Sequence, residues 1–291
     1  MITGAVMGNN AKPLSISSIY KKNIRRFALA FVFWSAVYVL HGCLLTYLKN
    51  GSVERSFSDL FWEFLRGHYH MWFLYMIIGL YIVLPLLRKI AESEKLTFYF
   101  LMVALVFSVV LPAVCSIPGL SELETVYHKM SFHLVLGYSG YFMLGCYLSQ
   151  KQISGKAEGI FYGLGILGFL FTAGISAAMS AHQNQPIGYY SNFSVNVLLE
   201  TMAVYVFAKK RIGKISFGKG MEKGILRLSG SMFGVYLIHA LIMETLNYWG
   251  FNSLSFSPVL SVPVLSMTVF LISLVIVLLM ERIPLLRRVV L

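Results

Sequence analysis

The chain has 291 residues, of which 57% are hydrophobic and 12% are charged. An ordinary soluble domain carries about 25% charged residues, and a fold surrounded by water has no place for so much apolar surface. The composition therefore excludes a typical soluble protein. The formal net charge of +12 would point to nucleic acid in a soluble protein, but here the charge follows the order of the apolar segments, so no nucleic-acid partner is expected.

Eight apolar runs are long enough to cross a hydrocarbon layer of about 30 Å as helices. They cover residues 27–48, 70–90, 97–115, 130–149, 159–181, 191–208, 227–247 and 260–281. Because lipid offers backbone groups no hydrogen-bond partner, each run should be a helix that pairs its own backbone. The sequence predicts an all-α fold, a polytopic integral membrane bundle in one domain over residues 1–291.

Lys and Arg are distributed unevenly between alternate loops. Twenty of the 24 fall on one side of the membrane if the eight runs cross in alternation, and only Lys49, Arg55, Arg66 and Lys129 fall on the other. Cytoplasmic loops carry such an excess of Lys and Arg. We therefore expect a multi-pass protein of the cell membrane, in contact with the lipid bilayer, with both termini in the cytoplasm.

A short basic amphipathic segment, residues 15–26, leads into the first full run. It contains the candidate phosphate-binding residues Lys22, Arg25 and Arg26. Their charge suits phosphate groups, and two explanations stay open: contact with a phosphorylated substrate, or retention beside lipid headgroups on the cytoplasmic side.

The run from 70 to 90 has different ends. His70 and Trp72 open it in a way that suits a headgroup boundary, whereas Arg88 and Lys89 close it on the cytoplasmic side. His70 and His68 lie two residues apart and thus on different faces of a helix, and no carboxylate completes a convincing metal site. No metal is expected.

The run from 159 to 181 contains Gly163, Gly165 and Gly168 in formal Gly-x-Gly-x-x-Gly spacing. A nucleotide-binding fingerprint requires a preceding strand, which a membrane helix does not supply. With Gly159, these glycines instead predict close packing against another helix.

Three polar residues inside apolar runs are candidate site residues: Glu200, Tyr236 and His239. An ionised carboxylate at the middle of a bilayer costs roughly 2.5–3.5 kcal/mol, so Glu200 should face the bundle interior. Tyr236 and His239 share a helix face, and His239 lies about 18 Å beyond Arg227, past the middle of the membrane. For Glu200 and His239 the alternative is a structural hydrogen bond between helices.

Three segments resemble acyltransferase family 3, a family of membrane proteins that acylate surface glycans and related acceptors. HMWFLYMIIGLYIVLPLL at 70–87 is similar to its His-Leu-Trp-Phe-Leu segment. LSGSMFGVYLIH at 228–239 resembles its Leu-Gly-x-x-Ser-Tyr-x-Ile-Tyr-Leu-x-His signature, with Tyr236 and His239 at the matching positions. Residues 20–27 resemble Tyr-x-Lys-Arg-Ile-x-Arg-Ile, but Asn23 replaces the first Arg.

The resemblance implies O-acylation, with an acyl group such as acetyl passing from cytoplasmic acyl-CoA to a hydroxyl of a cell-surface glycan or a lipid-linked sugar precursor. Lys22, Arg25, Arg26 and Arg88 would then attract the acyl-CoA phosphates, and His70, Glu200, Tyr236 and His239 would line the path to the acceptor.

The resemblance also implies that the chain starts inside the family pattern. Thr3-Gly4 matches the Ser-Gly that closes the family's second membrane helix, so the helix carrying the family's Arg and its catalytic base His would precede Met1. Either the start is misplaced at an internal Met, or the chain is an N-terminally truncated, inactive homologue. A separate alternative is a transporter or flippase without chemistry. Transporters often show matched broken helices in repeated halves, and no such repeat is evident here.

Overall fold

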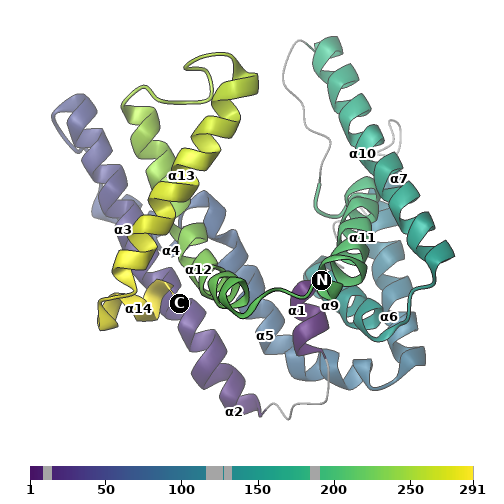
Figure 1. Ribbon diagram of the computed structural model, residues 1–291. Coiled ribbons are helices and arrows are strands. Elements are labelled where there is room, and N and C mark those ends of the chain that lie inside the picture. The colour runs from purple at the N-terminus through teal and green to yellow at the C-terminus, as the bar shows by residue number, and fades with distance from the viewer. Residues whose placement is uncertain (9–14, 116–126, 128–132, 184–190, 291) are drawn as a thin grey trace. The chain divides into compact units, whose positions relative to one another are not determined.

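The computed structural model describes the chain except residues 9–14, 116–126, 128–132, 184–190 and 291 (Figure 1). Every regular element in the described residues is a helix. The α-helices are α1 (Ile2–Met7), α2 (Ile16–Ser18), α3 (Arg25–Asn50), α4 (Phe57–Arg66), α5 (Trp72–Ala91), α6 (Glu94–Leu105), α7 (Leu111–Cys115), α9 (His133–Gln150), α10 (Gly155–Gln183), α11 (Val195–Lys210), α12 (Lys219–Tyr248), α13 (Pro258–Met280) and α14 (Pro284–Val290). Short π-helical and 3₁₀ turns are η1 (Ile19–Ile24), η2 (Tyr69–Met71), η3 (Val106–Val110) and η4 (Ile212–Lys214).

Six helical stretches among the described residues are long and apolar enough to cross a membrane. They are Ile16–Asn50, Phe57–Ala91, Glu94–Cys115, Gly155–His182, Lys219–Tyr248 and Pro258–Met280. The predicted runs at 130–149 and 191–208 correspond to α9, with 18 residues, and α11, with 16. The expectation of an all-α polytopic membrane bundle is confirmed.

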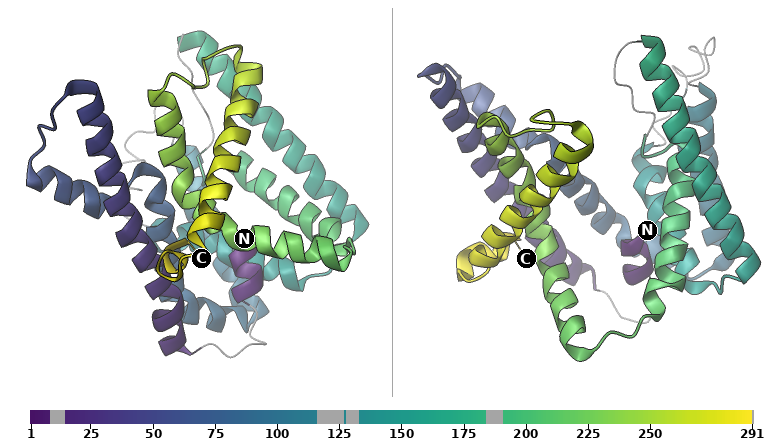
Figure 2. Two further views of the ribbon diagram at one scale, coloured as in Figure 1. Left: turned by 60° about the vertical axis from the view of Figure 1, so that its left-hand side comes forward. Right: turned by 45° about the horizontal axis from the view of Figure 1, so that its top comes forward.

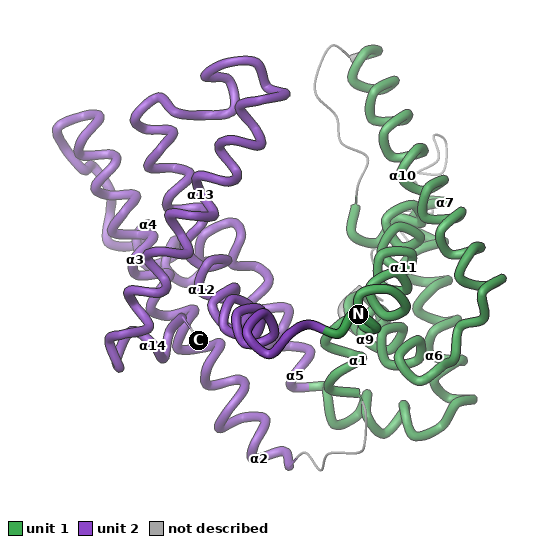
Figure 3. The backbone as a smooth tube through the Cα atoms, in the orientation of Figure 1, with its two compact units in different colours: residues 1–14, 83–216 green, residues 15–82, 217–291 purple. Residues whose placement is uncertain are grey.

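The chain divides into two compact units (Figure 3). Unit 1 comprises residues 1–14 and 83–216, and unit 2 comprises residues 15–82 and 217–291. Helix α5 starts in unit 2 and ends in unit 1, since the division falls after Ile82. Three of the candidate path residues, His70, Tyr236 and His239, belong to unit 2.

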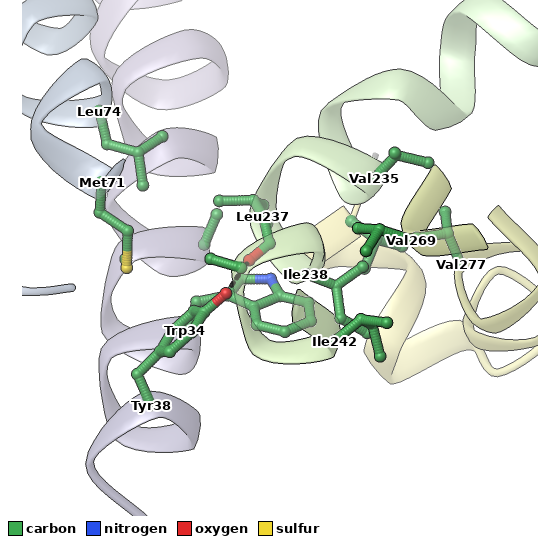
Figure 4. Packing of buried hydrophobic residues seen from close by; sticks show 13 residues of the cluster. Trp34, Tyr38, Met71, Leu74, Val235, Leu237, Ile238, Ile242, Val269 and Val277 are labelled. Atoms are coloured by element: carbon green, nitrogen blue, oxygen red, sulfur yellow. Dashed lines mark hydrogen bonds between the residues drawn. The ribbon is translucent and has the colours of Figure 1, made fainter. Parts of the chain in front are cut away.

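The core of unit 2 is built by α3, α12, α13 and α14, together with the start of α5. Figure 4 shows Trp34 and Tyr38 of α3 against Leu237 and Ile238 of α12. The indole Nε1 of Trp34 donates a hydrogen bond to the carbonyl oxygen of Val289 at 3.1 Å, which ties α14 to α3. The buried polar end of an otherwise apolar ring is thus satisfied within the same cluster.

The turn that carries the histidines of unit 2 is set by its flanking residues. Ser56 and Asp59 form a capping box that starts α4, and α4 ends at Gly67. Gly67 has φ +68°, and a Cβ there would lie 2.7 Å from the Phe31 ring, so a side chain is excluded on both counts. The chain leaves this glycine directly into His68 and His70.

In unit 1, α10 and α11 run side by side (Figures 1 and 2). Close approach is possible because a Cβ at Gly165 would lie 2.3 Å from Ala203 Cβ and one at Gly168 would lie 2.8 Å from the Asn196 carbonyl oxygen. Gly163 and Gly159 have no such neighbour within 4 Å. The predicted packing role is therefore confirmed for two of the four glycines and wrong for the other two, which lie on a different face of α10.

Candidate functional site

His70 lies in η2, immediately before α5, and only 6% of its surface is exposed. Its Nδ1 is 2.9 Å from Nδ1 of His68, which is a hydrogen bond between two imidazoles. Its Nε2 is buried and has no hydrogen-bond partner among the described residues. A buried polar atom without a partner costs free energy, so such an atom in a site needs a chemical reason.

His68 connects His70 to an acidic residue on α12. The Nε2 of His68 is 2.8 Å from Oε1 of Glu244. Its ring also stacks on the ring of Tyr38, with centroids 4.2 Å apart and an interplanar angle of 11°. The carboxylate and the aromatic face together hold this imidazole in one orientation.

Helix α12 places Tyr236 and His239 beside His70. The Tyr236 hydroxyl donates a hydrogen bond to the carbonyl oxygen of His70. The His239 Nδ1 lies 2.6 Å from the Tyr236 carbonyl oxygen and must be the donor in that contact, because a carbonyl only accepts. The ring centroid of His70 is 5.0 Å from that of His239 and 5.4 Å from that of Tyr236. The predicted residues of unit 2 therefore meet in one cluster.

Helix α3 completes this cluster with Tyr38 and His41. The His41 Nε2 is 3.0 Å from the Thr245 hydroxyl, and its Nδ1 is 3.6 Å from Oε2 of Glu244. Glu244 thus faces two imidazoles, one from α3 and one from the turn before α5. We define the histidine cluster as Tyr38, His41, His68, His70, Tyr236, His239 and Glu244.

Glu200 belongs to unit 1, where α11 presents it to α10. Its Oε1 accepts a hydrogen bond from the Thr172 hydroxyl at 2.7 Å, and Asn196 Nδ2 donates to the same hydroxyl at 2.7 Å. The sequence left two explanations for Glu200: a role in the site, or a structural hydrogen bond between helices. The contact with Thr172 is such an interhelical hydrogen bond. A role for Glu200 in the acceptor path stays a prediction.

The basic candidates lie at helix ends. Lys22, in η1, and Arg25, at the start of α3, are exposed. The Arg26 guanidinium packs 5.1 Å from the ring centroid of Phe233 and 5.7 Å from that of Phe27, which are cation–π contacts. Arg88 lies in the last turn of α5, in unit 1. Arg26 is exposed as well, so Lys22, Arg25 and Arg26 all remain accessible to a phosphate.

Sequence reasoning named three members of this cluster as site residues and missed the other four: Tyr38, His41, His68 and Glu244. Glu244 lies inside the apolar run 227–247, so the argument that singled out Glu200 applies to it equally. Tyr38 carried no comparable signal, because a tyrosine in an apolar run is ordinary. Across the described residues, no three His, Cys, Asp or Glu side chains are grouped in a way that could hold a metal ion.

A family model described as an acyltransferase domain matches residues 1–278, nearly the whole chain. This chain belongs to acyltransferase family 3. No curated protein and no solved structure shows significant similarity to it. Membership makes the protein a membrane acyltransferase, an enzyme that transfers an acyl group other than an aminoacyl group.

The histidine cluster offers this acyltransferase two kinds of chemical group. In a neutral imidazole, the ring nitrogen that carries no hydrogen can accept a hydrogen bond or a proton. The phenols of Tyr38 and Tyr236 are hydrogen-bond donors, and here they donate to backbone carbonyls. Both kinds lie in a packed environment, where electrostatic interactions are stronger than in water. Such a setting suits a reaction that moves a proton off a hydroxyl.

Proposed function

We propose that this acyltransferase moves an acyl group, acetyl in the simplest case, from acyl-CoA to a hydroxyl of a cell-surface glycan or of its lipid-linked precursor. The observation that carries the proposal is the meeting of His70, Tyr236 and His239 in unit 2 of a chain from this family. These residues come from the two segments by which the sequence resembles the family.

The reaction makes two demands on the protein. The hydroxyl oxygen attacks the thioester carbon, a C–O bond forms, the C–S bond breaks, and the hydroxyl proton must be taken up. The thiolate of CoA leaves and takes a proton from water. The buried imidazoles of the histidine cluster support the first demand, because an unprotonated ring nitrogen is a suitable proton acceptor near neutral pH.

The second demand is to hold a donor that carries several phosphate charges. Lys22 and Arg25 are exposed in and just after η1, and Arg26 follows directly. We infer that these residues, with Arg88, attract acyl-CoA from the cytoplasm, the side to which the excess of Lys and Arg assigns both termini. The proposed membrane is the cell membrane, where cytoplasmic acyl-CoA and surface glycan precursors are both within reach.

The test is a transfer assay in sealed membrane vesicles that contain the full chain. Vesicles receive acetyl-CoA labelled in the acetyl group, or labelled succinyl-CoA, together with extracted glycans or lipid-linked sugars. Label in an alkali-sensitive ester on the sugar, above the level in vesicles with an unrelated multi-pass protein, is the expected result. Absence of labelled ester with every donor and acceptor, from protein shown to be folded, would overturn the proposed function.

A further inference from the structure

An apolar cavity of about 270 Å³ lies in unit 1, the green part of Figure 3. Its walls come from α6, η3, α9, α10 and α11, and their lining surface is almost wholly apolar. On α6 and η3 the lining residues run from Phe98 to Val109, and on α9 from Leu136 to Leu148. At about 1.5 Å per residue these stretches cover roughly 16–18 Å, close to half of a hydrocarbon layer of about 30 Å. The cavity therefore suits an acyl chain from one leaflet.

Helix α6 forms the side of the cavity that borders on lipid. Phe98 and Met102 lie one turn apart on this helix and line the cavity, and they are 52% and 39% exposed. Exposed apolar side chains on a membrane span face acyl chains, which are as apolar as leucine. An acyl chain can therefore enter the cavity from the bilayer, between these two side chains and α10.

Helix α1 packs on another face of α9. A Cβ at Gly4 would lie 1.8 Å from the Phe142 carbonyl oxygen, and a Cβ at Gly145 would lie 2.0 Å from the Met1 carbonyl oxygen. Neither Phe142 nor Gly145 belongs to the cavity wall. The cavity is thus separate from the surface that α9 offers to α1.

A polar pocket of about 310 Å³ adjoins the apolar cavity at Tyr147, whose side chain lines both. The polar pocket lies where α5 ends, α6 begins and α9 ends. Lys151 forms an ion pair with Glu94, and its Nζ lies 5.3 Å from the centroid of the Tyr147 ring. The other polar side chains of the pocket are Glu92, Thr97, Cys146 and Gln150.

The helix register of α6 places the charges at the end of the apolar wall. Leu101 and Leu105 line the apolar cavity, and they share a face with Glu94 because they follow it by seven and eleven residues. The excess of Lys and Arg assigns this end of α6 to the cytoplasmic side. Together the two spaces have the polarity of a lipid: an apolar part at membrane depth and charged groups at the headgroup level.

The polar pocket carries charges of both signs. Lys151 suits a phosphate, whereas the carboxylates of Glu92 and Glu94 suit a cation. The side chains of Lys151 and Glu94 are 40% and 67% exposed, so a headgroup can reach both. A primary ammonium has three N–H donors for carboxylates, whereas a quaternary ammonium has none. The pocket thus matches a headgroup with a phosphate and a primary amine.

Lys209 of α11 fixes the position of Lys151. Its Nζ donates hydrogen bonds to the carbonyl oxygens of Leu148, Ser149 and Lys151 at 2.6, 2.9 and 2.8 Å. These contacts use all three donors of the ammonium group and satisfy carbonyls at the end of α9. Lys209 therefore holds the backbone beside the pocket, and Lys151 is the cation left for a phosphate.

We propose that unit 1 binds a phospholipid of the cytoplasmic leaflet whose headgroup carries a phosphate and a primary amine, as in phosphatidylethanolamine. One acyl chain fills the apolar cavity. The ion pair of Lys151 with Glu94 opens, the phosphate binds Lys151, and the ammonium binds Glu94 and Glu92. The site belongs to unit 1, whereas the histidine cluster belongs to unit 2, and lipid binding does not depend on the proposed acyl transfer.

The test is a competition between headgroups. The full chain is purified in detergent and mixed with equal amounts of three phospholipids that have the same acyl chains and ethanolamine, choline or glycerol headgroups. Native mass spectrometry then identifies the lipid that stays bound. We expect one ethanolamine lipid per chain, preferred by roughly 10-fold, because a charge-assisted hydrogen bond distinguishes it from choline.

Three variants assign the parts of the site. Leu105→Trp fills the apolar cavity and should abolish retention of the lipid. Lys151→Gln should weaken binding by roughly 10-fold, because the cation that meets the phosphate is lost. Glu94→Gln should reduce the preference for ethanolamine over choline. The control is Lys95→Gln, which removes an exposed charge next to Glu94 but outside both walls, and should match the parent within about twofold.

Several outcomes would overturn the proposal. The parent protein would retain no lipid, or would retain all three headgroups equally. Leu105→Trp, with an unchanged melting temperature, would bind the ethanolamine lipid like the parent. Long-chain acyl-CoA would displace the lipid, which would assign the cavity to the tail of an acyl donor. If Leu105→Trp does not fold, Lys151→Gln decides, since equal affinity in Lys151→Gln and Lys95→Gln overturns the site.

Discussion

The hydroxyl of Tyr38 on α3 donates a hydrogen bond to the carbonyl oxygen of Leu237 on α12 across 2.8 Å. The backbone N–H of Leu241 donates to the same hydroxyl at 3.1 Å. In a regular α-helix the carbonyl of residue 237 and the N–H of residue 241 bind each other. The phenol therefore bonds to both members of a helical pair and joins α3 to α12 beside His239.

The first prediction concerns this junction. Replacing Tyr38 by Phe should lower the free energy of unfolding by about 1 kcal/mol, since two backbone groups lose a partner but can bind each other instead. The measurement is the melting temperature in detergent. Tyr47→Phe is the control, because Tyr47 is on the same helix and 56% exposed, and equal melting temperatures for both variants would contradict the prediction.

A second prediction uses a pair of glycines on α10. Gly165→Ala should destabilise the protein by about 1–3 kcal/mol, because its new Cβ would meet Ala203 Cβ at 2.3 Å and force α10 and α11 apart. Gly163→Ala adds the same methyl group where no neighbour lies within 4 Å, and it should be neutral or stabilising by about 0.5–1 kcal/mol. Thermal unfolding followed by circular dichroism compares the two. A larger loss for Gly163→Ala would show that the packed face of α10 is assigned wrongly.

The third prediction separates the two roles of Glu200. Glu200→Gln keeps an oxygen that accepts from Thr172, so stability should change little, whereas Glu200→Leu loses this interhelical bond at a cost of about 0.6 kcal/mol. If Glu200 also lines the acceptor path, Glu200→Gln should lower kcat/KM for the acceptor with an unchanged melting temperature. Unchanged kcat/KM in that variant would leave Glu200 a structural role alone.

The fourth prediction concerns donor binding. Changing Arg25 and Arg26 together to Ala should raise KM for acyl-CoA by roughly 10-fold or more, because charge-assisted hydrogen bonds to phosphate are lost. The control is Arg287→Ala with Arg288→Ala, two exposed residues at the end of α14 whose loss removes the same net charge. Initial rates at varied acyl-CoA concentration supply both KM values. An equal rise in the two variants would mean that overall charge attracts the donor and that Arg25 and Arg26 make no specific contact.

Much of the fold followed from the sequence because lipid imposes a simple rule. A run of about 20 apolar residues must be helical, so the eight predicted runs all contain helices in the structure. Local signals were less complete. The four glycines of α10 share a motif, yet only Gly165 and Gly168 face α11, since the face a helix turns to its neighbour depends on the neighbour.

The candidate site was likewise predicted from the sequence only in part. The sequence by itself identified His70, Tyr236 and His239 as candidate site residues. Each is a polar side chain in or at the end of an apolar run, and an unpaired polar group in lipid costs free energy. Only the tertiary structure decided that Glu244 reaches His68 and that His68 reaches His70, since these contacts depend on how α12 packs beside the turn after Gly67. Apolar segments can be recognised from consecutive residues in the sequence, whereas hydrogen bonds between distant residues depend on how the helices pack.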